Sequence, residues 1–149
     1  MRSSIDELWP ACATLAPEAL FKLAREAKSR AYAPYSGFHV GAACLSENNE
    51  IALGCNVENG SFGLSMCAER SALAASRVLG HVKTLASAVA GDADGPCFPG
   101  GACRQVIFER NPDMRVVVST WNGVEIHRIA DLLPFAFDLP GRRHDDGPF

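Results

Sequence analysis

The spacing of apolar side chains along the chain predicts alternating helices and strands. From residue 17 to 32, small and apolar residues recur every three or four positions, charged residues occupy the other faces, and Pro17 suits the first position of a helix. Residues 37–54 are predicted to form a β-hairpin, because "FHVGAACLS" alternates and the polar "ENN" makes a turn before "EIALG". A second helix is predicted over residues 66–79, with Gly80 as its C-terminal cap.

The second half of the chain continues this alternation. Residues 84–91 form a nearly continuous apolar run, which is typical of a strand covered on both faces. Asn122-Gly123 favours a type I′ hairpin turn into "VEIHRI". The other predicted elements are a helix, a strand and a last short helix, at residues 102–110, 115–120 and 129–133.

The order of these elements, α-β-β-α-β-α-β-β-α, indicates the fold class. Strands interleaved with helices favour an α/β fold, here a three-layer α-β-α sandwich with a mixed five-stranded sheet. The 149 residues suffice for one domain with a real core, so we expect a single domain over residues 1–149. Residues 138–149 are expected to form a flexible C-terminal tail.

Composition and charge exclude several classes of function. The apolar fraction of 48% and the charged fraction of 21% are ordinary for a globular protein, and the net charge of −3 argues against coating nucleic acid. No run of about 18 apolar residues exists to cross a membrane. The first 20 residues lack the continuous apolar stretch of a secretory signal, so we expect a cytoplasmic protein whose six cysteines pack, bind metal or react.

Two cysteines at predicted helix starts are the main chemical candidates. Cys67 is followed two residues later by Glu69, and a helix start lowers the pKa of a thiol and so favours the metal-binding thiolate. Alone, this pattern also fits a buried cysteine beside a solvated glutamate. Cys103, in "ACRQV", begins a second helix. Because each of the two helices follows a loop and precedes a strand, we expect both helix starts to lie at one edge of the sheet. Zinc deaminases use this arrangement of a Cys or His, a Glu and a later P-C-x-x-C.

Four stretches together resemble a known family. "APYSGFHVGAACL", "GCNVENGSFGLSMCAERSAL", "GGACRQV" and "LLPFAF" occur in the order found in the small, zinc-dependent, homotetrameric cytidine deaminases, and they span residues 33–137. The resemblance implies a Zn²⁺ cofactor, a homotetramer and a small nucleoside substrate, with no nucleic-acid or membrane partner. The implied reaction converts cytidine or deoxycytidine to the uracil nucleoside and ammonia, as in pyrimidine salvage.

The resemblance also implies roles at the metal. Cys67 and Cys103 would be zinc ligands, and Glu69 would be the proton carrier that serves the attacking water, N3 of the pyrimidine and the leaving ammonia. Three thiolates would leave the zinc centre net negative. Arg70 resembles the arginine that donates hydrogen bonds to the thiolates and offsets that charge, although taken singly it also fits a surface arginine.

A further set of residues is implied to bind the substrate: Phe38, Asn56, Val57, Glu58, Ala68 and Phe137. Asn56 and Glu58 match the residues that bind the ribose hydroxyls, since an amide and a carboxylate can pair with vicinal hydroxyls. Without the resemblance, these two positions also fit an ordinary Asn- and Gly-rich turn, and each phenylalanine fits core packing. Phe62 stands where tyrosine is common in the family, which would change a contact with another subunit or with the sugar.

One position departs from the pattern. The family motif would be P-C-G-A-C, whereas Gly100 follows Pro99, so the first cysteine is missing in the simplest alignment. Three explanations compete. The zinc site is lost or altered, Cys97 replaces the missing cysteine ligand, or Gly100 is a substitution introduced into the protein. Six residues rotate about 240° on a regular helix, so Cys97 could reach the zinc of Cys103 only if the Pro-Gly-Gly stretch folds back. We favour loss or alteration.

These alternatives define the rival functions. A catalytically impaired, nucleoside-binding member of the fold, with weak zinc or none, would follow from Gly100. Deamination of a modified or non-nucleoside cytosine-like substrate would follow from Phe62.

Overall fold

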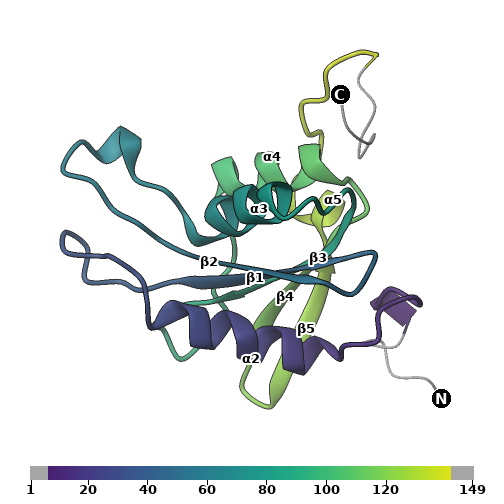
Figure 1. Cartoon of the computed structure of the whole chain (residues 1–149), viewed down its shortest axis with the longest axis horizontal. Coiled ribbons are helices and arrows are strands. Elements are labelled where there is room, and N and C mark those ends of the chain that lie inside the picture. Colours follow the sequence, from purple (N-terminus) through teal and green to yellow (C-terminus); the bar gives the residue numbers. More distant parts are fainter. Residues whose placement is uncertain (1–6, 142–149) are drawn as a thin grey trace.

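The computed structural model describes residues 7–141, and its centre is one mixed five-stranded sheet with the order β2-β1-β3-β4-β5 (Figure 1). β3 and β4 are parallel, and the other three neighbouring pairs are antiparallel. The strands are β1 (Gly41–Ser46), β2 (Ile51–Cys55), β3 (Thr84–Ala90), β4 (Arg115–Thr120) and β5 (Gly123–Arg128). The chain therefore forms the mixed five-stranded sheet that its sequence predicts.

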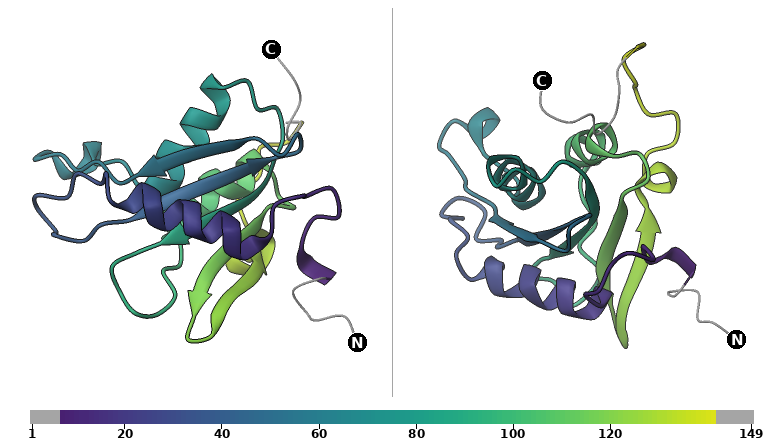
Figure 2. Two further views of the ribbon diagram at one scale, coloured as in Figure 1. Left: turned by 60° about the horizontal axis from the view of Figure 1, so that its bottom comes forward. Right: turned by 45° about the vertical axis from the view of Figure 1, so that its right-hand side comes forward.

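Helices cover both faces of this sheet, which gives three layers (Figure 2). One face carries α2, and the other carries α3, α4 and α5. The helices are α2 (Pro17–Lys28), the short 3₁₀ helix η1 (Phe62–Leu64), α3 (Ala68–Val78), α4 (Gly101–Arg110) and α5 (Ile129–Leu132). The three-layer α-β-α sandwich is thus confirmed.

Strand β1 lies at the centre of the two cores, with every residue buried. Ala42 and Cys44 pack in the cluster beneath α3, whereas Ala43 and Leu45 pack in the cluster beneath α2. The alternation found in the sequence therefore assigns side chains to two buried faces, rather than to one buried and one solvated face.

Two glycines allow the helices to approach the sheet closely. A Cβ atom on Gly41 would lie 2.0 Å from the carbonyl oxygen of Ala24 in α2. A Cβ atom on Gly54 would lie 2.3 Å from the backbone nitrogen of Ala72 in α3. Helix α2 would have to move outward if Gly41 carried a side chain, and α3 would have to move if Gly54 did. Helix α3 is the one whose start bears Cys67.

The structure corrects two local predictions. Helix α2 ends at Lys28 instead of residue 32, because the following backbone turns away and the Tyr32 N–H donates to the carbonyl of Asn56. Thr120 pairs with Gly123 in the β4–β5 hairpin, so its loop residues are 121 and 122, one position earlier than predicted. Of the predicted turn pair only Gly123 has a positive φ, 148°, whereas a type I′ turn needs two such residues, so the type I′ prediction is wrong.

The ends of the described chain limit two other expectations. Most of the predicted C-terminal tail, residues 142–149, lies outside the described residues. Among the helices of residues 7–141, none has both the length and the apolar character needed to cross a bilayer.

Candidate active site

The starts of α3 and α4 meet at one edge of the sheet. Cys67 is the N-cap of α3, and Cys103 lies in the first turn of α4. One ligand atom from each of Cys67, Glu69 and Cys103 lies within 4.8 Å of the other two. The convergence that the βα order predicts is therefore present, and it joins two thiols with a carboxylate.

The carboxylate of Glu69 is buried beside the thiols. Only 5% of the residue is exposed, and burial raises the pKa of Glu69 above its ordinary value, partly offset by hydrogen bonds from its own N–H and from Cys103. Burial likewise raises the pKa of the Cys103 thiol, and the negative charge of Glu69 adds to this effect. The poorly hydrated site thus disfavours the ionised forms of both groups unless a cation compensates their charge.

Arg70 supplies part of that compensation. Its Nη2 atom donates to the carbonyl of Ser65 at 3.0 Å and to the Sγ atom of Cys67 at 3.7 Å. The contact with Cys67 raises the pKa of Arg70, and its Nε atom is buried without an acceptor in the described structure. The guanidinium therefore lies where it can offset thiolate charge.

A pocket of about 480 Å³ opens over these groups. Its lining consists of Ser36, Phe38, Val40, Asn56, Glu58, Cys67, Ala68, Glu69, Cys97, Phe98, Gly100, Gly101, Ala102 and Cys103. The lining comes from the loops before β1, after β2 and before α4, together with the starts of α3 and α4. Most of the predicted site residues therefore share one pocket, together with Ser36, Val40 and Phe98, which the sequence reasoning did not single out.

Two predicted substrate-binding residues lie elsewhere. Val57 is absent from the lining and pairs through its backbone with Tyr32 and Met66. Phe137 follows α5, is 67% exposed and is joined to α4 by a hydrogen bond from Gln105 to its carbonyl oxygen. Neither side chain contributes to the pocket of this single chain.

Hydrogen bonds hold Asn56 and Glu58 in fixed positions in the lining of the pocket. The amide of Asn56 accepts from the Val40 N–H at 2.8 Å and donates to the carbonyl of Phe38 at 2.9 Å. Glu58 accepts from the hydroxyl and N–H of Ser36 and from the N–H of Tyr35. These bonds, that of the Ser36 hydroxyl first, lower the pKa of Glu58, so the carboxylate is ionised at neutral pH.

Cys97 and Gly100 occupy different parts of the same pocket. The Sγ atom of Cys97 lies so close to Gly91 that a Cβ atom there would be 2.8 Å from it, with the Phe38 ring alongside. Cys97 does not belong to the group of three converging donors. Gly100 is the N-cap of α4, and a Cβ atom built on it meets no heavy atom within 4 Å.

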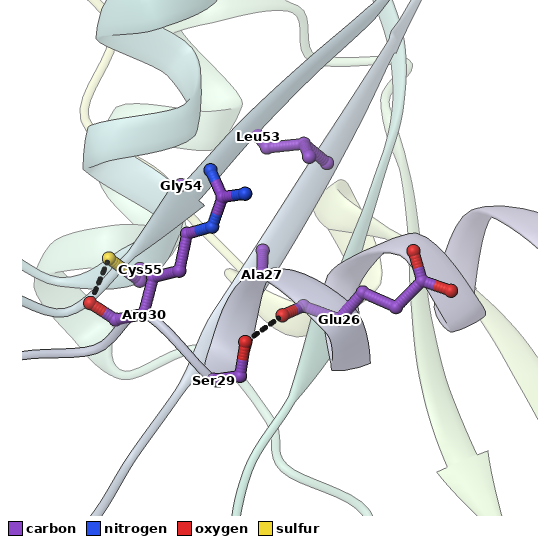
Figure 3. Close-up of a pocket in the computed structure, with 7 residues that line it drawn as sticks. All are labelled: Glu26, Ala27, Ser29, Arg30, Leu53, Gly54 and Cys55. Atoms are coloured by element: carbon purple, nitrogen blue, oxygen red, sulfur yellow. Dashed lines mark hydrogen bonds between the residues drawn. The ribbon is translucent and has the colours of Figure 1, made fainter.

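A second cavity, of about 370 Å³, lies between the end of α2 and strand β2 (Figure 3). Its thiol, Cys55, donates to the carbonyl oxygen of Arg30 at 3.4 Å, and the Ser29 hydroxyl donates to the carbonyl of Glu26. Among the described residues, three metal-binding donors converge only at Cys67, Glu69 and Cys103. The pocket over the helix starts is therefore the candidate active site.

Comparison with known proteins agrees with this geometry. Residues 16–120 match the family model described as the cytidine and deoxycytidylate deaminase zinc-binding region. The chain belongs to this family. Cytidine deaminase of Sporosarcina psychrophila is 43% identical over 122 residues, which are 80% of this chain and 90% of that protein. Cytidine deaminase of Mycobacterium tuberculosis is 40% identical over 123 residues, with the same two shares.

Solved structures of the family share the fold. The crystal structure of cytidine deaminase from Burkholderia pseudomallei superimposes with a TM-score of 0.75 at 46% identity, over 80% of this chain and 97% of that one. The structure from M. tuberculosis gives a TM-score of 0.72 at 38% identity, over 80% and 95% of the two chains.

The donor set fits the zinc of this family region. Zn²⁺ binds thiolate sulfur at about 2.3 Å and carboxylate oxygen at about 2.0–2.2 Å, so two donors on one tetrahedral ion lie roughly 3.5–3.8 Å apart. The three donors here lie within 4.8 Å of one another, and small side-chain rotations close the difference. Zinc also supplies the positive charge that the buried carboxylate lacks.

Proposed function

We propose that this protein hydrolyses cytidine and deoxycytidine to the uracil nucleosides and ammonia. Water forms a new bond to C4 of the pyrimidine, and the bond from C4 to the amino nitrogen breaks. The observation that carries the proposal is the convergence of Cys67, Glu69 and Cys103 in a pocket that Asn56 and Glu58 also line.

The metal end of the pocket would perform the chemistry. Cys67 and Cys103 would hold Zn²⁺, which when bound polarises water so that it attacks at neutral pH. Glu69 would carry a proton from the attacking water to N3 and then to the leaving nitrogen, a role that suits a buried carboxylate whose raised pKa lets it hold a proton. Arg70 would offset thiolate charge through its contact with Cys67.

The remaining polar and aromatic residues of the lining would bind the nucleoside. Glu58 is ionised and would accept from a ribose hydroxyl, and the Asn56 amide would contact the same sugar. Phe38 lines the pocket and would pack against the nucleoside. Ala68 is the first residue of α3, so its N–H lacks an acceptor within the helix and is suited to donate to the pyrimidine carbonyl.

The charges of the pocket favour a nucleoside over a nucleotide. The family region includes deaminases of both kinds, but the lining contains two carboxylates and no Lys, Arg or His. The adjacent cavity, lined by Tyr35, Ser36, Glu58, Phe62 and Ser65, also lacks a cation. A substrate phosphate at that end would meet the Glu58 carboxylate without a compensating charge.

A cytoplasmic homotetramer is part of the proposal. The segment between β2 and α3 exposes a run of apolar side chains: Val57, Phe62, Leu64 and Met66. Burial of this surface against another copy would stabilise an assembly. Because Phe137 lies outside this chain's pocket, its proposed contact with substrate requires the pocket of a neighbouring copy.

Two alternatives rest on single positions. Gly100, which offers no donor, favours a catalytically impaired member that binds nucleosides. Phe62 contacts Tyr35 edge-on, with ring centroids 6.0 Å apart, beside the cavity that shares Glu58, and it favours a modified or non-nucleoside cytosine-like substrate.

Ammonia release from a substrate panel tests these functions. Cytidine and deoxycytidine should be deaminated. Cytosine lacks the sugar that contacts Glu58, and the phosphate of deoxycytidine monophosphate is repelled by that carboxylate. Both should therefore have a kcat/KM at least about tenfold lower. Folded protein with bound zinc that releases no ammonia from any member, yet binds cytidine, would establish the impaired alternative. Preference for a modified base would establish the other.

A further inference from the structure

Gly100 leaves room at the metal site but supplies no donor. It lines the pocket, one helical turn before Cys103, and its φ and ψ of −69° and 169° suit any residue. A side chain there would extend into open space. The backbone is therefore arranged as if for a side chain, and the chain must complete its zinc coordination in another way.

Cys97 is poorly placed to do so. Its side chain lies against Gly91, and its thiol lies outside the group of converging donors. To reach the metal it would have to leave that packing. The remaining protein donor in the group is the carboxylate of Glu69.

We propose that Glu69 is itself a zinc ligand in the resting protein, so that the metal is held by two thiolates and one carboxylate. This inference rests on the zinc centre of the proposed function and adds to Glu69 a role beyond proton transfer. A carboxylate replaces the charge of a third thiolate, so the set still carries three negative charges against two positive ones. Arg70 therefore has the same net charge to offset, and the buried Glu69 gains the cation that its burial requires.

The same proposal gives Glu69 two positions along the reaction. As a ligand Glu69 would hold the metal together with Cys67 and Cys103, and as a proton carrier it would have to be free of the metal.

A double-mutant cycle on metal affinity tests this without measuring turnover. Zinc dissociation constants are compared for the unchanged protein, Glu69→Gln, Gly100→Cys and the double variant, by competition with a chromophoric chelator. If Glu69 is a ligand, Glu69→Gln should weaken binding by about 10- to 100-fold in the unchanged background. It should weaken binding by less than about threefold when Gly100→Cys supplies a third thiolate, because only the through-space charge effect then remains.

Gly100→Ala is the matched control, since it adds a side chain in the same open space without a donor. It should leave zinc affinity within about threefold of the unchanged protein, whereas Gly100→Cys should tighten it by roughly 100-fold. The thiolate-to-metal absorption of the cobalt-loaded proteins counts the sulfur ligands. It should indicate two in the unchanged protein and in Cys97→Ala, and three in Gly100→Cys.

Two results would overturn the inference. An equal loss of affinity from Glu69→Gln in both backgrounds would show that the carboxylate acts only through its charge. A lower cobalt–thiolate absorption in Cys97→Ala would show that Cys97 is the third ligand. Because neither readout uses the substrate, failure here is distinct from failure to deaminate nucleosides, which would leave these affinities unchanged.

Discussion

The two helix starts of the active site have nearly the same backbone but different chemistry. Cys67, the N-cap of α3, has φ −72° and ψ 153°, and Gly100, the N-cap of α4, has φ −69° and ψ 169°. Neither cap makes a side-chain hydrogen bond to its helix. One cap carries a thiol that meets Cys103, and the other carries nothing. The two N-caps thus share a backbone geometry, and only the one at α3 carries a metal-binding side chain.

The loops leading into the two helices are both held by a carboxylate. Before α3, Glu58 binds the backbone of Tyr35 and Ser36. Before α4, Asp92 accepts from the N–H and the Nδ1 atom of His39, at 2.7 and 2.8 Å, and pairs with Lys28 at 3.1 Å. Each loop is therefore held by a carboxylate that is not one of the three converging metal donors.

Replacement of the α3 donor should have the largest effect. Cys67→Ala makes the start of α3 resemble that of α4 and leaves one thiol in the cluster. Metal content after gel filtration should fall from about one zinc per chain to near zero, and kcat/KM for cytidine should fall by at least about 10³-fold, since metal catalysis contributes several kcal/mol.

Cys97→Ala is the matched control for this variant, because it removes another thiol from the same pocket. It should retain its zinc. If Cys67→Ala also retained stoichiometric zinc, the two caps would be equivalent and the assignment of Cys67 as a ligand would be wrong.

Glu69→Gln should have the next largest effect, on turnover. An amide cannot carry a proton between water, N3 and the leaving nitrogen, and general acid–base groups contribute about 10²- to 10⁴-fold to rate. We expect kcat to fall by that factor, measured as ammonia release at a zinc concentration that saturates the variant. A variant that keeps its kcat under these conditions would remove Glu69 from the proton path and make it a ligand only.

The sequence predicts the helix and strand order well because apolar periodicity and burial agree in most elements. The exceptions arise where tertiary contacts decide the local backbone. Helix α2 stops at Lys28 because Tyr32 pairs with the segment after β2, and no pattern within residues 17–32 encodes that pairing. The β4–β5 turn shifts by one residue because strand register, rather than the Asn-Gly pair, fixes the loop.

The residues of the site likewise divide into those whose positions the sequence predicts and those whose positions it does not. Cys67, Glu69 and Cys103 can be predicted to converge, because the βα order places both helix starts at one edge. The position of Cys97 cannot, because it depends on packing against Gly91 and Phe38 across the pocket. The open space at Gly100 likewise depends on what the neighbouring side chains leave unfilled, which one-dimensional spacing does not contain.

Replacement of Glu58, the carboxylate in the loop before α3, should have a smaller effect, on KM for cytidine. Glu58→Gln removes the negative charge that we propose accepts from the ribose, so KM for cytidine should rise by roughly tenfold while kcat changes less. Cytosine, which lacks the sugar, should show no such change. Ser36→Ala serves as the control, because it removes the hydroxyl bond to Glu58 but leaves the charge. An equal loss for cytidine and cytosine would indicate that Glu58 only shapes the pocket.

The smallest effect should come from the corresponding carboxylate before α4, and it should appear in stability rather than in binding. Bonds from His39 and Lys28 hold the pKa of Asp92 well below its ordinary value of 3.8. A carboxylate with a lowered folded-state pKa contributes stability above about pH 4 and loses it as the pH falls through the folded-state value. Asp92→Asn should therefore unfold at a lower urea concentration than the unchanged protein near pH 7. The gap should narrow as the pH is lowered below about 4, where protonation begins to remove the same contribution from Asp92. An equal difference in urea midpoint at both pH values would mean that the Asp92 charge does not secure this loop. The loops before α3 and α4 would then resemble each other in backbone shape but not in how a charge holds them.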